Sequence, residues 1–314
     1  MQTELHRHLD VSLRLSTLLR LAQERGFEAQ STSLQAFEQK QVLRKPLSNL
    51  SEVLAQFTLY QKVLDRPEVI EQVGFEAVED CFREGTRKVE FRYSPEFVSE
   101  FSRLSFEDVL LAFRQGIQRG IQHYPEMQAG LICIASRDYG AERVDQTVDF
   151  FLRHRDEFIG LDLAGNEAQF PCRLFESSFQ RAKKTGARIT VHAGEASGPE
   201  NVWEALELLG AERIGHGIQS FQDPLLIEEL KTRKICLEMC PTSNWLTQAV
   251  PSLKAHPLPL ALRAQVPVCI NTDDPSIFGV SLPHEIQVAR EEIGLTQAEV
   301  EECQQNASHH SFLP

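Results

Sequence analysis

Two motifs containing histidine have residue types and spacing suited to metal or proton chemistry. His6 and His8 are separated by one residue, so on a β-strand both would point to one side and could hold the same ion. His192 precedes Glu195 by three residues, and the Ala-Gly turn between them could return the carboxylate toward the same space. Neither motif is decisive alone, because histidines at a strand end can be polar edge residues and a carboxylate in a turn can simply face solvent.

Two further motifs lie in the last third of the chain. His216 stands between Gly215 and Gly217, where a core histidine bonded to the backbone is an equally good interpretation. Asp273 and Asp274 follow an apolar run, and adjacent carboxylates cannot both face one ion in the same way. A helix N-cap is the alternative for either of them. The prediction of a shared site therefore depends on the coincidence of these motifs at several expected strand ends.

Together these residue types support metal-assisted hydrolysis. Three imidazoles and one carboxylate suit zinc and leave a further position for water. Zinc lowers the pKa of a water that it binds toward neutrality, so the chemistry needs no strong base. A carboxylate and a histidine that do not bind the ion would then carry protons.

The motifs fall at the ends of strand-like segments. Short apolar, β-branched runs alternate with amphipathic helical segments, which is the pattern of repeated βα units and a parallel sheet. The eight expected strands begin at Thr3, Lys88, Gln128, Phe158, Arg188, Arg213, Lys234 and Val266. We predict one α/β domain over residues 1–314, a (β/α)8 TIM barrel, whose catalytic groups gather at the C-terminal strand ends. An open doubly wound sheet is the alternative.

Helix signals separate these strands. Pro199 and Gly210 are suited to begin and end a helix after the fifth strand, and Thr296 with Glu299 resembles a capping box. Between the first and second strands, residues 11–87 form a helical stretch longer than one crossover needs. We expect additional helices there that could cover the mouth of the barrel.

Composition limits the partners. A net charge of −13 over 314 residues argues against binding to nucleic acid or an anionic membrane, whereas a neutral or cationic small molecule is easily accommodated. No apolar run approaches the roughly 20 residues that span a bilayer, and the N-terminus lacks a signal sequence, so we expect a cytoplasmic protein. The seven cysteines lack paired spacing and are expected to be reduced, with Cys236 and Cys240 as buried small residues and not metal ligands.

Six segments resemble, in order and context, the adenosine deaminase family of the amidohydrolase superfamily. They are HRHLD (6–10), DLAG (162–165), VHAGE (191–195), RIGHG (213–217), CPTSN (240–244) and NTDDP (271–275). The resemblance continues to residues 311–313 and so covers essentially the whole chain. It implies zinc-dependent hydrolytic deamination of a 6-aminopurine nucleoside, with adenosine and 2′-deoxyadenosine leading, within cytoplasmic purine metabolism.

The resemblance also implies how the site works. One Zn²⁺ per chain would be held by His6, His8, His192 and Asp273. Glu195 would donate a proton to purine N1, and His216 would orient and help deprotonate the zinc-bound water. Asp274 would contact purine N7.

Four further residues are implied on the substrate side. The backbone N–H of Gly165 would donate to purine N3, a place where a side chain would obstruct the ring. Asp10 is similar to the family's ribose-contacting aspartate. Leu54 and Phe57 resemble apolar residues that close over the nucleoside, although helix packing explains them equally well.

Two departures from the family pattern bear on the exact substrate. Val11 stands where the family commonly has glycine, and Asn166 where it usually has aspartate. Adenine, an adenosine 5′-phosphate or another N9-substituted aminopurine are the alternative substrates. Asp10 favours a nucleoside, because relatives that take adenine tend to carry glutamate at this position. A 5′-phosphate would need a cationic partner near the sugar, and Arg7 and Arg14 are nearby in sequence, but the sequence does not show where their side chains point. A catalytically inactive barrel used as a binding module is the remote alternative.

Overall fold

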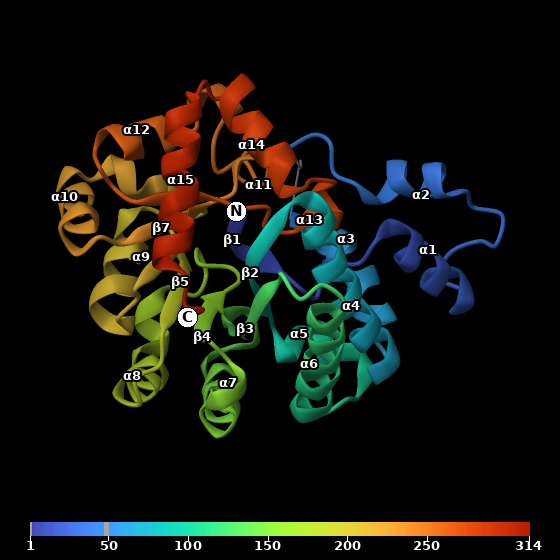
Figure 1. Ribbon diagram of the computed structural model, residues 1–314. Helices are drawn as coiled ribbons and strands as arrows, with labels where there is room; N and C mark the ends of the chain where they lie inside the picture. The colour runs from blue at the N-terminus through green and yellow to red at the C-terminus, as the bar shows by residue number, and fades with distance from the viewer. Residues whose placement is uncertain (1, 47–49) are drawn as a thin grey trace.

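The computed structural model describes residues 2–46 and 50–314, without the side chains of residues 50–55. In this part of the chain, eight parallel strands pair in the order of the sequence around a barrel (Figure 1). They are β1 (Gln2–His8), β2 (Thr86–Tyr93), β3 (Gln128–Ser136), β4 (Gly160–Ala164), β5 (Ile189–Ala193), β6 (Arg213–His216), β7 (Cys236–Met239) and β8 (Val268–Ile270).

Helices connect the strands and surround the barrel (Figure 1). The first half contains α1 (Leu15–Glu24), α2 (Leu34–Gln41), α3 (Leu50–Val63), α4 (Pro67–Glu84), α5 (Pro95–Ser102), α6 (Phe106–His123) and α7 (Ala141–Arg153). The second half contains α8 (Glu176–Lys184), α9 (Pro199–Glu204), α10 (Pro224–Arg233), α11 (Pro241–Leu246), α12 (Leu258–Arg263), α13 (Pro275–Phe278), α14 (Leu282–Glu291) and α15 (Gln297–His310). Within the described residues, no helix is both long and apolar enough to cross a membrane.

The barrel closes through the residue three positions beyond the end of β8. Asp273 forms a parallel bridge with Arg7 of β1. Its backbone N–H donates to the carbonyl of His6 at 3.0 Å, and its own carbonyl accepts from the N–H of His8 at 2.9 Å. Closure of the barrel therefore brings the side chain of Asp273 beside the two histidines of β1. The predicted (β/α)8 barrel, with additional helices between β1 and β2, is confirmed.

Each observed strand begins within two residues of its predicted start. The prediction works because strands covered on both faces contain apolar, β-branched runs between turn residues, as in β3 and β8. In β1 and β2 the apolar residues are interspersed with charged or polar ones. The helix that begins at Pro199 continues as a π-helical turn and ends at Gly210, whose φ is +71°. The capping box of Thr296 and Glu299 is also present.

The insertion between β1 and β2 contacts segments that follow strand ends. The N–H of Leu43 donates to the carbonyl of Ile277 at 2.8 Å, and the hydroxyl of Ser276 donates to the carbonyl of Leu13 at 2.5 Å. Helix α3 packs against α5, which follows β2. These contacts place α3 and the segments around Leu13 and Leu43 at the C-terminal end of the barrel, where the polar motifs lie.

Charged side chains fill part of the barrel interior. The buried guanidinium of Arg213 pairs with Glu238 and with Glu90, each at 2.6 Å. Glu90 in turn accepts the hydroxyl of Ser311 at 2.8 Å and the N–H of Phe312. This network connects the end of the chain to the strands that carry the site. All seven cysteines, each within the described residues, are buried and free, as expected.

Candidate active site

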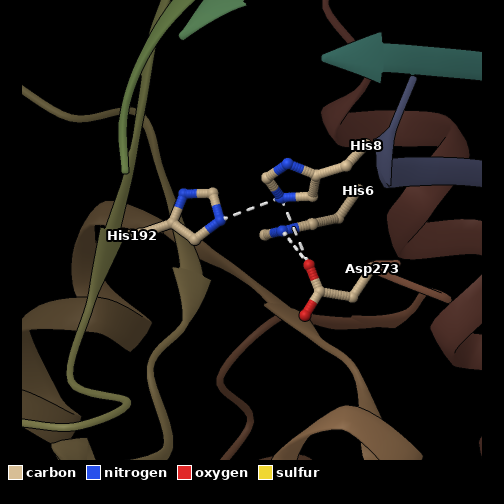
Figure 2. A group of neighbouring side chains, drawn as sticks. All are labelled: His6, His8, His192 and Asp273. Carbon is tan, nitrogen blue, oxygen red and sulfur yellow. Dashed lines mark hydrogen bonds and ion pairs between the residues drawn. The ribbon is translucent and has the colours of Figure 1, made fainter. Parts of the chain in front are cut away.

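Three imidazoles and one carboxylate converge at the C-terminal ends of the strands. His6 and His8 come from β1, His192 from β5 and Asp273 from the segment after β8, and their ligand atoms all lie within 4.8 Å of one another. Figure 2 shows the four side chains pointing toward a common centre. The Oδ1 atom of Asp273 lies 3.2 Å from Nε2 of both His6 and His8. Nε2 of His8 lies 3.3 Å from Nε2 of His192.

Two of these histidines are oriented by buried carboxylates. Nδ1 of His6 lies 2.9 Å from Oε2 of Glu238, and Nδ1 of His192 lies 3.1 Å from Oδ1 of Asp162. A carboxylate accepts hydrogen bonds, so in each ring Nδ1 carries the hydrogen and Nε2 keeps its lone pair. Both lone pairs therefore face the common centre.

This arrangement fits a bound cation. Nε2 of His6 is buried and has no hydrogen-bond partner among the described residues, and the nearest oxygen of Asp273 is itself an acceptor. Burial lowers the pKa of His6, and it lowers the pKa of His192 to about 3, so both rings are neutral at physiological pH. Acceptors that face one another in this way repel unless a positive ion lies between them. Neutral imidazoles with one carboxylate form a donor set suited to zinc.

One arginine joins the two carboxylates that orient the histidines. Arg92 donates to Asp162 at 2.8 Å and to Glu238 at 2.7 Å, and all three side chains are fully buried. Burial alone would raise the pKa of Glu238, but Arg92 and the other positive groups hold it well below its usual range. Neither Arg92 nor Glu238 was assigned from the sequence. Glu238 could have been found, since it is the one charged residue of the apolar strand β7, whereas Arg92 is one of four charged residues in β2 and does not stand out.

His216 and Asp273 share an unusual backbone conformation. Their φ angles are +63° and +64°, in the left-handed region that residues other than glycine adopt infrequently. Such conformations cluster at functional sites, because surrounding contacts must hold them in place. His216 ends β6 and Asp273 closes the barrel, so at both positions the chain turns where a side chain must face the site.

Glu195 lies beside the four converging side chains. One carboxylate oxygen accepts the hydroxyl of Thr247 at 2.9 Å, and the other lies 3.5 Å from Nε2 of His216. The amide of Asn244 lies between them, 3.0 Å from Nδ1 of His216 and 3.5 Å from Glu195. Glu195 is thus placed to exchange a proton with a bound molecule. Thr247 and Asn244, both contributed by the segment after β7, were not assigned from the sequence.

Two carboxyl groups near the site are shifted toward the protonated form. Burial raises the pKa of Asp10 to about 6, although one of its oxygens accepts the N–H of Ser94 at 2.9 Å. Burial and the charge of Asp273 raise the pKa of Asp274 well above its usual range. Asp274 holds the N-cap position of α13 without capping it, and its Oδ1 atom is buried with no partner among the described residues. The hydroxyl of Tyr60, unremarked in the sequence, is likewise buried and unpartnered there.

A sequence model described as adenosine deaminase matches residues 2–314. The chain belongs to this family. The adenosine deaminase of Shigella flexneri serotype 5b (strain 8401) is 39% identical over 311 residues, which cover 99% of this chain and 93% of that relative. The resemblance inferred from the sequence motifs is therefore confirmed.

Solved structures of related deaminases share the fold. An adenine deaminase from Arthrobacter aurescens aligns with a TM-score of 0.89 at 25% identity, covering 100% of this chain and 94% of that one. The N6-methyl-AMP deaminase from Arabidopsis thaliana aligns with a TM-score of 0.84 at 28% identity, covering 100% and 92%. These two structures and the Shigella relative are named for three different aminopurines, so the substrate must be argued from this chain's own residues.

The adenosine deaminase motif DLAG ends in a glycine that the structure requires. Gly165 has a φ of +101°, and a Cβ there would lie 2.3 Å from a carboxylate oxygen of Asp138. The other oxygen of Asp138 accepts the N–H of Asn166 at 3.0 Å, while the side chain of Asn166 accepts from Gln169 at 3.1 Å. An aspartate at position 166 could accept the same N–H of Gln169, so these contacts do not explain the departure from the family pattern.

The apolar residues assigned by resemblance to the adenosine deaminase family are only partly described. Phe57 is half-buried in α3 and packs edge-on against Phe97, with 6.2 Å between ring centroids. Leu54 also belongs to α3, but its side chain lies outside the described residues. Val11, which replaces the usual glycine, is 2% exposed and packs in the core. The side chain of Val11 is therefore accommodated in the protein interior.

Proposed function

We propose that this chain is a zinc-dependent deaminase that hydrolyses the 6-amino group of adenosine and 2′-deoxyadenosine, releasing inosine or 2′-deoxyinosine and ammonia. The observation that carries the proposal is the convergence of three imidazoles and Asp273 next to two proton-carrying groups, His216 and Glu195. The match to the adenosine deaminase family supports this substrate class.

One zinc ion per chain would be held by His6, His8, His192 and Asp273. When bound, zinc lowers the pKa of water toward neutrality and so supplies a nucleophile at physiological pH. Water then adds to C6 of the purine and the C6–N bond breaks. Overall, Glu195 gives a proton to N1, and the two protons of the water end on the departing ammonia and on the carboxylate of Glu195. The other steps, which orient the purine and move these protons, would be carried out by side chains and backbone groups of this chain.

Glu195 is the proposed proton donor to purine N1. Protonation of N1 makes C6 electrophilic, which assists the attack of water. The hydroxyl of Thr247 holds one carboxylate oxygen of Glu195 and leaves the other toward His216. His216 would orient the attacking water through the hydrogen on Nε2, and would assist its deprotonation by stabilising the negative charge that develops on the water oxygen.

Two groups would orient the purine ring. Purine N7 is an acceptor, so a carboxyl group that contacts it must carry a proton. The raised pKa of Asp274 and its unpartnered buried oxygen support that role. The backbone of Gly165 has no side chain to obstruct the ring, which supports its N–H as the donor to N3.

The sugar end favours a nucleoside over the alternative substrates. Asp10 is a buried carboxyl that would lose a partner if the ribose were absent, which disfavours adenine. For a 5′-phosphate, the two arginines near Asp10 in the sequence are already paired. Arg7 bonds to Glu84 at 3.1 Å, and Arg14 bonds to Asp80 at 2.5 Å.

A substrate panel tests the proposal. Purified protein is assayed with adenosine, 2′-deoxyadenosine, adenine and adenosine 5′-phosphate by the ultraviolet change on loss of the amino group. We expect the two nucleosides to give the highest kcat/KM, by about tenfold or more. A tenfold preference for adenine or the phosphate would refute the nucleoside assignment and leave deamination standing. No deamination of any of them, with zinc bound, would support an inactive binding barrel.

A further inference from the structure

A buried glutamate outside the assigned motifs binds the loop that carries Glu195. The carboxylate of Glu167 accepts hydrogen bonds from the backbone N–H groups of four consecutive residues, 194–197. One oxygen accepts Gly194 at 2.8 Å, and the other accepts Glu195 at 2.7 Å, Ala196 at 2.5 Å and Ser197 at 3.0 Å. Glu167 is 4% exposed and lies in the loop after β4, so this loop is held by a neighbouring strand's loop.

The turn is also constrained on its other side. Gly194 has a φ of +70°, and a Cβ there would lie 2.6 Å from Val202 of α9. The carbonyl of Gly194 accepts the N–H of Gln219 at 2.8 Å. The backbone of the loop is thus pressed between α9, the segment after β6 and the carboxylate of Glu167.

A buried arginine balances the charge of Glu167. Burial raises the pKa of Glu167, while Arg137 and the backbone N–H groups lower it in part. Arg137 is fully buried, and its guanidinium donates to the carbonyl of His192 at 2.8 Å. Arg137 therefore holds the backbone near the end of β5, and Glu167 holds the backbone of the turn that follows it.

We propose that Glu167 is a positioning residue for the proton donor, which it serves by fixing the backbone of residues 194–197. This inference rests on the proposed role of Glu195. Hydrogen bonds to an ionised acceptor are roughly twice as strong as neutral ones, and here one carboxylate receives four. Without them the four N–H groups would turn toward water, and the carboxylate of Glu195 would leave its place beside Thr247 and His216. A misplacement of about 1 Å costs on the order of 100-fold in rate.

Glu167→Gln tests the inference, because it keeps the size of the side chain and removes its charge and one acceptor oxygen. We expect faster hydrogen–deuterium exchange in a peptide covering residues 190–201 and a fall in kcat of about tenfold or more. KM should stay within about threefold and the zinc content should be unchanged, since neither the purine contacts nor the metal ligands are altered. Unchanged exchange, or kcat within about twofold of the wild type, would overturn the inference.

Glu204→Gln is the matched control, because Glu204 also accepts a backbone N–H, from Arg173 at 2.9 Å, but outside the active site. It should leave kcat and the exchange of residues 190–201 unaltered. If Glu167→Gln does not fold, Glu167→Asp is used in its place, because it keeps the negative charge on a shorter side chain. Hydrogen–deuterium exchange of residues 190–201 and kcat are then measured in the same way, with the same criteria.

The wild-type substrate panel separates this inference from the proposed function. If a purine other than adenosine is deaminated, the comparison is made with that substrate. If none is deaminated, the proposed function fails, and so does the proposal that Glu167 positions a proton donor. The exchange measurement needs no activity and reports on the loop alone.

Discussion

The side-chain amide of Asn244 donates a hydrogen bond to Nδ1 of His216 at 3.0 Å. The direction of this amide is set by the backbone N–H of Cys240, which donates to its oxygen at 3.2 Å and so turns its nitrogen toward the imidazole. A neutral His216 then accepts at Nδ1 and carries its hydrogen on Nε2, which lies 3.5 Å from Glu195. In this tautomer His216 offers an N–H to the site and orients what it contacts.

Asn244→Asp should lower kcat by about 100-fold, as is typical when acid–base groups are disturbed. A carboxylate would attract the hydrogen to Nδ1 of His216 and would also repel Glu195, so both proton-carrying groups would change. Steady-state kinetics with zinc analysis measures the effect, with metal content expected to be retained. Asn306→Asp is the control, because the Asn306 amide donates to a backbone carbonyl outside the site, that of Val268. Turnover within a few-fold of the wild type would refute this role for Asn244.

Glu195→Gln should reduce kcat by at least about 100-fold with zinc retained, because the amide keeps the hydrogen bond from Thr247 but has no acidic proton to give. Kinetics and metal analysis are carried out on the same preparation. Loss of the metal would show that Glu195 is a ligand, and near-normal turnover would show that the proton comes from elsewhere.

Asp10→Ala should cost about 1.5–3 kcal/mol in kcat/KM for adenosine, the range for a hydrogen bond to a charged group. The same change should affect adenine much less, because adenine has no sugar to contact. The ratio of the two kcat/KM values before and after substitution is the measurement. An equal loss on both substrates would place Asp10 against the base or the fold instead of the ribose.

Asp162→Asn should weaken zinc binding by about 10- to 100-fold, the usual cost of losing a group that orients a metal ligand. The carboxylate of Asp162 holds Nδ1 of His192 and shares Arg92 with Glu238. Chelator competition gives the affinity. Asp149→Asn, which alters an exposed ion pair with Arg181, should leave it unchanged. Equal zinc affinities in the two variants would contradict the orienting role.

Zinc affinity should rise with pH until about pH 9. Burial alone would lower the pKa of His8, but the carboxylates of Asp274, Asp273 and Asp10 raise it to about 9 in the metal-free protein. Below that pH a proton occupies His8 and competes with the metal, so the affinity should increase about tenfold per pH unit and then level off. The same proton stabilises the metal-free fold below the ordinary pKa of 6.5, and this stabilisation is lost as the pH rises through about 9.

Competition titrations at about pH 7, 8 and 10 would measure this dependence. Replacing His8 by Gln removes the titrating group, so the remaining zinc affinity should no longer rise with pH in this range. Affinity that is independent of pH between about 7 and 9 in the wild type would refute the assignment.

The order of the strands and the positions of the polar motifs were predictable from the amino-acid sequence. Most of the parallel strands are covered on both faces and contain short apolar, β-branched runs, so their starts can be predicted from local composition. His192 and Asp273 were recognised for the same reason, since His192 follows an apolar run directly and Asp273 follows one after two residues, and the end of each run marks the mouth of the barrel.

The groups that orient those residues, and the groups that balance their charges, depend on how the chain folds. Glu238 is 232 positions from His6, and Asn244 is 28 positions from His216, so closure of the barrel makes contacts that no local pattern encodes. Burial adds a second reason, because a carboxyl such as Asp274 changes its pKa through the surroundings that the fold supplies. The directions of Arg7 and Arg14 could not be predicted either, because their carboxylate partners Glu84 and Asp80 lie far along the chain, on α4.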